Sequence, residues 1–416
     1  MLDLRLIRRE PDAVRAALAR RGAGDAERLD ELLALDSSWR AATQAAEALR
    51  ADQKAASEEV AAGKRSGADV SAQLEHLKGV SAEAKLLGER AREAEAQLQE
   101  LLRGLPNLPD PSAAEPPDEV LRTVGDGTAR GRDHLELAGE RIDMERGARL
   151  SGTRFAYLRG DLVMLELALV QWSMSKLRGH GFEPVIPPVL VRERALFGTG
   201  QLPDTEQQIY ELAGDELYLV GTSEVALASL HADEILDAAQ LPLRYAGFSP
   251  CFRREAGAGG KDTRGIFRVH QFDKVEMFSF VAPSQSAEEH ERLLAIEEEI
   301  MGELEIPYRV VNIAVDDLGS SAAKKYDIEA WLPGQGRYRE LTSTSNTTDF
   351  QARRLEIRMR PEGGRPEVLH TLNGTAVAVG RTIVALLENG QRDDGSVALP
   401  AVLGAFGAPA ELPAAG

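Results

Sequence analysis

The stretch FRREAGAGGKDTRGIFRVHQFDKVE, residues 252–276, decides how the rest of this 416-residue chain is interpreted. Its flanks, YAGFSPCFRRE and GIFRVHQFDKVEMFSF, are rich in aromatic and branched residues, which favour β-strands. Its glycine-rich centre, AGAGGKDTRG, is typical of a loop. Arginine presents a planar fork of donors that matches phosphate oxygens. Two arginine-bearing strands joined by a basic loop therefore predict a hairpin that holds a polyanionic ligand.

The polar residues of this hairpin follow the two-residue period of a strand. Arg253 and Glu255 would share one face, and Arg268, His270 and Phe272 would repeat that alternation on the return strand. The alternative is an ordinary hairpin whose basic tip is solvated. Convergence of polar groups on one face favours a site.

Composition narrows the class of protein. The net charge is −18, so contact with nucleic acid is expected only locally. The single cysteine, Cys251, excludes a disulfide framework and a cysteine-based zinc site. The most apolar run, residues 162–174, contains Glu166 and is too short to span a bilayer, and the N-terminus lacks the apolar run of a signal peptide. We expect a cytoplasmic protein with no zinc and no membrane association.

Residues 27–103 predict a long helical hairpin. They lack proline, and small or apolar residues alternate spacings of three and four, with a break at residues 63–67. Such spacing in two limbs is typical of an antiparallel coiled coil. The first seam runs through Leu32, Leu35, Trp39, Ala42, Ala46, Leu49, Gln53, Ala56 and Val60, and the second through Val70, Gln73, Leu77, Val80, Ala84, Leu87, Ala91, Ala94, Leu98, Leu101 and Leu105.

This arm differs from the rest of the chain in charge. Residues 47–92 hold eight acids and eight bases, so the whole negative excess lies elsewhere. Lys54, Lys64 and Arg65 lie along the first limb and its tip. These charges are either ordinary solvated faces of a coiled coil or contacts to a nucleic acid.

The remaining chain predicts an α+β fold, an antiparallel sheet flanked by helices. A proline-rich linker, residues 104–119, separates an N-terminal domain of residues 1–103 from a second domain of residues 120–403, and residues 404–416 are expected to be disordered. Strands are expected in EPVIPPVLV, ELYLVGTSE, PYRVVNIAV and RYRELTSTSNTT, and helices in DLVMLELALVQWSMSKLRGHG and AVGRTIVALLENG. Pro188 would lie in an edge or interface strand.

Three separated patches together resemble the signature motifs of class II aminoacyl-tRNA synthetases. They are GFEPVIPPVLV, the hairpin of residues 252–276, and HTLNGTAVAVGRTIVALLENGQ. The phosphate-loop pattern GxxxxGK[ST] and the dinucleotide pattern GxGxxG are not found in positions that would support them. Over nearly its whole length the chain further resembles the bacterial-type seryl-tRNA synthetase family, through MLDLRLIRREPDAV, LPNLPDPS, GTGQLP, LYLVGTSE, HQFDKVEMF, GRYRELTSTSN, DFQARR and TLNGTAVAVGRT.

The resemblance implies an activity and a set of roles. Serine and ATP would give seryl-adenylate, and serine would then pass to tRNA(Ser) and also to tRNA(Sec). Arg253 would hold the α-phosphate, Glu255 would contact the adenine amino group, and Phe272 and Arg381 would enclose the adenine ring. The family also implies a homodimer built on the patch that contains Pro188.

The implied site residues fall into five groups. The catalytic residues would be Arg253, Arg268 and Arg381. The ATP site would comprise Arg253, Arg254, Glu255, Val269, Phe272, Glu340, Leu341, Thr342, Ser343 and Arg381. Serine would be bound by Thr222, Ser223, Glu224, Glu276, Asn346 and Thr375. Mg²⁺ would be held by Glu340 and Ser343, and tRNA by Lys54, Lys64 and Arg65.

Three alternatives remain open at this stage. One is a tRNA-binding or coiled-coil protein with a degenerate catalytic domain, which the presence of Arg253, Glu255, Glu340 and Arg381 disfavours. Another is an amino acid:carrier-protein ligase, which would lack the long arm. The third is a paralogue that serves antibiotic biosynthesis or self-resistance. Thr375 and Thr347 depart from the serine and cysteine common in the family, and both lie near the expected serine pocket.

Overall fold

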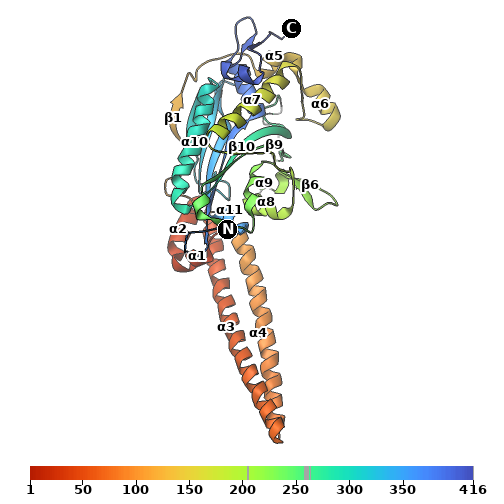
Figure 1. The fold of residues 1–416 in the computed structure, drawn as a ribbon, viewed down its shortest axis with the longest axis vertical. Coiled ribbons are helices and arrows are strands. Elements are labelled where there is room, and N and C mark those ends of the chain that lie inside the picture. The colour runs from red at the N-terminus through yellow and green to blue at the C-terminus, as the bar shows by residue number, and fades with distance from the viewer. Residues whose placement is uncertain (204–205, 257–261, 263, 416) are drawn as a thin grey trace. The chain divides into compact units, whose positions relative to one another are not determined.

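The computed structural model describes residues 1–203, 206–256, 262 and 264–415 (Figure 1). The chain divides into two compact units, Leu2–Pro106 and Asn107–Gly416, and Met1 belongs with the second. Within the described ranges, no helix has both the length and the apolar composition needed to cross a membrane.

The first unit is a helical hairpin preceded by two short helices. α1 (Leu4–Arg9) and α2 (Pro11–Arg21) pack near the start of α3 (Ala23–Ser66), where Leu18, Leu29 and Leu32 are fully buried. α4 (Ser71–Gly104) runs back along α3 (Figure 1). At 1.5 Å per residue, helices of 44 and 34 residues extend roughly 66 and 51 Å. The predicted hairpin is confirmed.

The predicted seam is buried or half-buried at every position of the first limb. Gln53 donates a hydrogen bond to Ser81 across the two helices at 3.2 Å. One position of the second limb is wrong: Gln73 is exposed and Leu74 is half-buried instead. Seven-residue spacing therefore identified the face, with a one-residue error just after the turn.

The turn between the limbs begins later than the sequence suggested. α3 continues through Gly63 and ends at Gly67, whose φ of +72° suits glycine. A Cβ on Gly63 would lie 2.5 Å from a methyl carbon of Val70. Gly63 is thus needed for close approach of the two limbs rather than to end the helix.

The second unit is built on an eight-stranded sheet with the order β1-β11-β12-β13-β16-β10-β9-β4. All neighbours are antiparallel except β4 and β9, which are parallel. The α+β prediction is confirmed. The strands are β1 (Glu119–Val124), β4 (Glu183–Val185), β9 (Leu243–Phe252), β10 (Gln271–Val281), β11 (Tyr308–Asn312), β12 (Lys324–Leu332), β13 (Arg337–Thr348) and β16 (His370–Ala378).

Helices cover one face of this sheet. α7 (Asp161–Gly179), α10 (Ser286–Glu303) and α12 (Val379–Asn389) pack on it and form the main core with inward residues such as Val275 and Met277. Because side chains alternate along a strand, Lys274, Glu276 and Phe278 point to the opposite face. That second face carries a smaller core, which includes Phe278 and Phe280, and leaves room for a pocket.

Smaller elements complete the second unit. The short helices are α5 (His134–Ala138), α6 (Met144–Ser151), α8 (Glu193–Thr199), α9 (Glu224–Ala228) and α11 (Phe350–Arg354). The short strands are β2 (Ile142–Asp143), β3 (Tyr157–Leu158), β5 (Leu190–Val191), β6 (Tyr210–Leu212), β7 (Leu217–Leu219), β8 (Ile235–Asp237), β14 (Arg358–Arg360), β15 (Glu367–Val368), β17 (Val397–Ala398) and β18 (Glu411–Leu412).

Two expected irregular segments are ordered parts of this unit. The amide of Asn107, inside the expected linker, donates to Ser321 and Thr347 backbone oxygens at 2.9 and 2.8 Å. The tail predicted to be disordered instead forms β18, which pairs with β17. Its apolar residues Ala408 and Leu412 join the main core, so burial of a few side chains outweighs the low-complexity composition.

The strand predicted around Pro188 is also wrong. β4 ends at Val185 and β5 begins at Leu190, so Pro188 lies between two short strands that belong to different sheets. Prolines 187 and 188 cannot donate to a ladder, which explains the interruption.

Candidate active site

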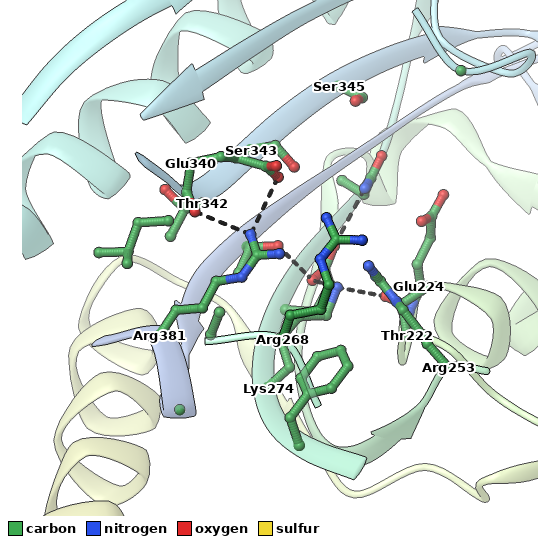
Figure 2. A pocket seen from close by; sticks show the side chains of 18 of the residues that line it. Thr222, Glu224, Arg253, Arg268, Lys274, Glu340, Thr342, Ser343, Ser345 and Arg381 are labelled. Atoms are coloured by element: carbon green, nitrogen blue, oxygen red, sulfur yellow. Dashed lines mark hydrogen bonds and ion pairs between the residues drawn. The ribbon is translucent and has the colours of Figure 1, made fainter. Parts of the chain in front are cut away.

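A pocket of about 280 Å³ opens on the face of the large sheet opposite α7, α10 and α12. Strands β10, β13 and β16 supply many of its polar side chains, and others, such as Thr222, Glu224, Arg253 and Arg381, come from outside these strands (Figure 2). Fourteen predicted residues line it: Thr222, Glu224, Arg253, Glu255, Arg268, Val269, Phe272, Glu276, Glu340, Leu341, Thr342, Ser343, Thr375 and Arg381. The sequence-based grouping therefore identified one continuous surface.

One end of the pocket is built around a buried carboxylate. Glu276 accepts hydrogen bonds from Asn373 and Thr375, both at 3.2 Å. Sheet register explains the cluster, because Glu276 of β10 lies directly opposite Thr375 of β16. Lys274, two residues earlier on the same face, forms an ion pair with Glu276 at 2.5 Å and donates to the Thr222 hydroxyl at 2.7 Å. We call Thr222, Glu224, Lys274, Glu276, Asn373 and Thr375 the acidic end.

Glu224, the second carboxylate of the acidic end, has a raised pKa. Burial and the nearby charge of Glu276 raise the pKa of Glu224 to about 7 from its ordinary 4.5. The side chain of Gln351 donates a hydrogen bond to Glu224 at 2.7 Å and partly opposes that shift. A cationic ligand would favour the ionised form of Glu224. The acidic end is therefore prepared for a small molecule that carries an ammonium group and a hydroxyl.

The other end is lined by arginines, and we call Arg253, Glu255, Arg268, Phe272, Glu340 and Arg381 the arginine end. The guanidinium of Arg253 lies 5.3 Å from the centre of the Phe272 ring and donates to the Gly221 carbonyl at 3.1 Å. Arg268 forms an ion pair with Glu255 at 2.8 Å. The guanidinium of Arg381, in the first turn of α12, lies 4.9 Å from the Phe267 ring centre. Three arginines around one cavity suit an oligophosphate.

Two side chains with oxygen atoms, at or beside the arginine end, have the chemistry of magnesium ligands. Glu340 and Ser343 both line the pocket on β13. Burial would raise the pKa of Glu340, but its side chain is 47% exposed to the cavity and the charges of Arg381 and Lys325 hold this pKa below its ordinary value. An ionised carboxylate and a hydroxyl fit Mg²⁺, which takes few protein ligands and completes its shell with phosphates and water. Across the described part of the chain, no cluster of three or more His, Cys, Asp or Glu residues forms a metal site.

Three predicted residues do not line the pocket. Arg254 is exposed and borders a different hollow with Tyr210 and Tyr218. The Ser223 hydroxyl is buried against the Gly247 carbonyl at 3.4 Å. The Asn346 amide oxygen accepts from Ser286 at 3.0 Å on the helix-covered side of the sheet. Of the three, Asn346 follows from alternation along β13, because its neighbour Ser345 lines the pocket.

The two strands of the predicted hairpin are shorter than expected. β9 ends at Phe252 and β10 begins at Gln271, so Arg253, Glu255, Arg268 and His270 lie outside the ladder. Glu255 has a φ of +49°, which no regular strand permits. A backbone hydrogen bond from Arg253 to His270, at 2.9 Å, and the ion pair between Arg268 and Glu255 still connect the two segments. Most of the predicted glycine-rich loop, residues 257–261 and 263, lies outside the described residues.

Sequence reasoning missed Lys274 and Asn373. A signal for Lys274 was present, because it stands two residues before Glu276 and shares its strand face. Asn373 is likewise two residues from Thr375.

The two threonines that depart from the family pattern differ in their contacts. Thr375 donates a hydrogen bond to Glu276 directly. The Thr347 hydroxyl lies 3.4 Å from Gln351, which in turn contacts Glu224.

Comparison with known proteins agrees with this geometry. Residues 1–109 match the family described as the seryl-tRNA synthetase N-terminal domain, and residues 208–390 match the tRNA synthetase class II core domain of the G, H, P, S and T enzymes. The chain is 52% identical to a serine–tRNA ligase of Streptomyces coelicolor over 97% of this chain and 96% of the relative. It is also 52% identical to a serine–tRNA ligase of Nocardia farcinica over 98% of each.

A solved structure extends the comparison to three dimensions. Seryl-tRNA synthetase from Pyrococcus horikoshii, complexed with ATP, superposes with a TM-score of 0.95 at 40% identity over the full length of both chains. The match to the class II core domain and the full-length likeness to serine–tRNA ligases show that the chain is a class II aminoacyl-tRNA synthetase. Within that class the chain belongs to the seryl-tRNA synthetase family, whose activity is serine–tRNA ligation.

Proposed function

We propose that this pocket activates L-serine with ATP and then transfers the seryl group to tRNA(Ser), and also to tRNA(Sec). The observation that carries the proposal is the continuity of the acidic end with the arginine end in one cavity. An amino acid in the first and a nucleotide in the second would bring a carboxylate next to an α-phosphate. The ATP complex of the Pyrococcus horikoshii relative supports ATP as the nucleotide.

In the first step, a serine carboxylate oxygen attacks the α-phosphorus of ATP, and the bond to the bridging β-phosphate oxygen breaks to release diphosphate. Arg253 would stabilise the charge that builds on the α-phosphate. Arg268 would leave Glu255 for the outer phosphates, which frees Glu255 to accept from the adenine amino group. Phe272 and Arg381 would enclose the adenine ring.

In the second step, a terminal ribose hydroxyl of the tRNA attacks the carbonyl carbon of seryl-adenylate. The carbon–oxygen bond to AMP breaks, and the hydroxyl proton is lost. The protein would position reactants and stabilise charge without a covalent enzyme intermediate. Thr222, Glu224, Glu276 and Thr375 would hold the serine ammonium and hydroxyl throughout.

Glu340 and Ser343 would hold Mg²⁺. When bound, the ion would neutralise phosphate charge and polarise a phosphoryl oxygen. The partly exposed, ionised carboxylate of Glu340 supports this assignment.

The arm would bind tRNA through Lys54, Lys64 and Arg65, all of which are exposed. The active form would be a cytoplasmic homodimer. Exposed apolar side chains on and beside α7 and β4 support a covered surface there: Leu167 is 57% and Ile186 81% exposed. Sedimentation that showed a stable, active monomer at micromolar concentration would refute the dimer.

The deciding experiment is serine-dependent exchange of labelled diphosphate into ATP, followed by charging of purified tRNA(Ser) and tRNA(Sec). Exchange with serine and charging of both tRNAs are expected. Exchange without charging of either tRNA would support the activation of serine and refute its transfer. Charging of tRNA(Ser) alone would refute only the proposed use of tRNA(Sec).

A further inference from the structure

A buried carboxylate on α12 ties together segments that are distant in sequence. Glu388, which is 1% exposed, accepts a hydrogen bond from the Gly334 amide at 2.9 Å in the turn between β12 and β13. Its other oxygen lies 3.3 Å from the His134 amide and 3.2 Å from His134 Nδ1. Glu388 does not line the pocket, and the chemistry described above gives it no role.

His134 extends this network toward the arginine end. The imidazole is 5% exposed, and Nε2 accepts a hydrogen bond from the Ile266 amide at 3.3 Å. A backbone N–H can only donate, so Nε2 carries no proton and Nδ1 carries the one it donates to Glu388. The two contacts of the ring thus fix its tautomer and its orientation.

Gly265 makes the contact with Ile266 possible. Its φ is +82°, and a Cβ there would lie 2.0 Å from His134 Nε2. The next four residues, Ile266 to Val269, all line the pocket. Among them, Phe267 packs against the Arg381 guanidinium, and Arg268 pairs with Glu255. A second contact supports the same segment, because Arg264 lies 3.3 Å from the Asp133 carboxylate beside His134.

We propose that His134, oriented by Glu388, is a positioning residue for ATP: it holds residues 265–268 so that Phe267 and Arg268 meet the nucleotide in the correct place. The inference rests on the proposed function. The contacts of His134 reach the segment that carries Arg268 of the arginine end, whereas the acidic end is held by its own hydrogen bonds to Glu276. Removal of the hydrogen bond between His134 and Ile266 should therefore raise the KM for ATP and leave the KM for serine unchanged.

Two substitutions of His134 separate its two hydrogen bonds. The amide nitrogen of asparagine can take the place of Nδ1, so His134→Asn keeps the bond to Glu388 and loses the acceptor for Ile266. The amide oxygen of glutamine reaches the place of Nε2, so His134→Gln keeps the acceptor for Ile266. We expect His134→Asn to raise the KM for ATP by about 5- to 10-fold, the loss of one hydrogen bond, and His134→Gln to raise it no more than about 2-fold. The KM for serine should stay within about 2-fold in both.

The measurement is diphosphate exchange by the full-length protein with each substrate varied in turn, together with the Tm of each variant. Equal effects of the two variants, a larger effect of glutamine, or parallel changes in both KM values would overturn the proposal. If His134→Asn does not fold, Gly265→Ala decides, because its methyl group would displace the imidazole from Ile266. It should raise the KM for ATP alone. Wild-type protein without serine-dependent exchange would instead overturn the proposed function, and with it the basis of this inference.

Discussion

The arm and the catalytic core differ in where their charged side chains lie. Along α3 and α4, small and apolar residues form a buried seam, and the charged side chains Lys54, Lys64 and Arg65 are exposed. In the core pocket, Lys274 and Glu276 are almost completely buried and depend on one another. Exposed charges are strongly screened by water and salt, whereas buried charges are screened much less and each must be compensated by neighbouring groups. The contrast supports the proposal that the core carries the chemistry and that the arm binds tRNA.

The largest expected effect is at Arg253, the proposed catalytic arginine. Arg253→Ala should lower serine-dependent diphosphate exchange by about 10² or more, because a donor to the charged transition state is removed. Arg254→Ala is the matched control, since its side chain is exposed and borders another hollow. It should stay near wild type. Similar losses in the two variants would show that the segment's overall charge, not the placement of Arg253, matters.

A pair of carboxylate substitutions tests whether the core pocket has two ends. Glu276→Gln should raise the KM for serine by on the order of 10- to 100-fold, the cost of a buried charge-assisted contact, with the KM for ATP nearly unchanged. Glu255→Gln should do the reverse. Steady-state exchange with each substrate varied gives all four values. A variant in which both KM values rise together would argue against separate ends.

Removal of charge from the arm should have a smaller effect that depends on salt. Changing Lys54, Lys64 and Arg65 together to glutamine should weaken tRNA binding and reduce the slope of log K against log salt by up to about 3, roughly one for each phosphate that is no longer neutralised. Exchange should be unaffected. The exposed acid Glu58 on the same helix supplies a control, Glu58→Gln. An unchanged slope in the triple variant would mean that these residues do not meet phosphates.

The smallest effect concerns pH. Below about pH 7, Glu224 of the empty pocket is protonated and offers no charge to an ammonium group. The KM for serine should therefore fall a few-fold as the pH rises from 6 to 8, while the KM for ATP stays flat. Glu224→Gln should abolish this dependence. A flat serine profile in wild type would contradict the raised pKa.

The same pKa has a consequence for stability. The folded-state value of about 7 exceeds the ordinary 4.5, so the folded protein keeps this proton while the unfolded chain loses it. The free energy of unfolding therefore falls as the pH rises between these values. Denaturant titrations of wild type and Glu224→Gln at pH 5 and pH 8 should show a smaller decrease in the variant.

The arm was predictable from sequence because its contacts are local. A three-and-four spacing specifies which face of each helix is buried, whatever lies elsewhere in the chain. The error at Gln73 arose at the turn, where Val70 packs against Gly63 and resets the phase of α4.

The core was predictable only in part. Lys274 and Asn373 reach Glu276 because β10 and β16 are neighbours in register, and no local pattern specifies which strands pair. Several elements have no counterpart among the predicted segments, among them α10 and three strands of the large sheet, β1, β12 and β16. Most of the predicted pocket residues were found through a resemblance to a family, and alternation along β13 would have corrected Asn346.

One measurement tests the separation of arm and core most directly. Residues 44–90 would be replaced by a short glycine-rich bridge, which keeps Asp36 and its ion pairs with Arg8 and Arg40 at the base of the arm. Exchange and tRNA charging would then be compared with the full-length protein. The account predicts that serine-dependent exchange stays within a few-fold of normal while charging falls by about 10² or more, because contacts to the nucleic-acid backbone supply most of the affinity. Efficient charging by the armless protein would contradict it.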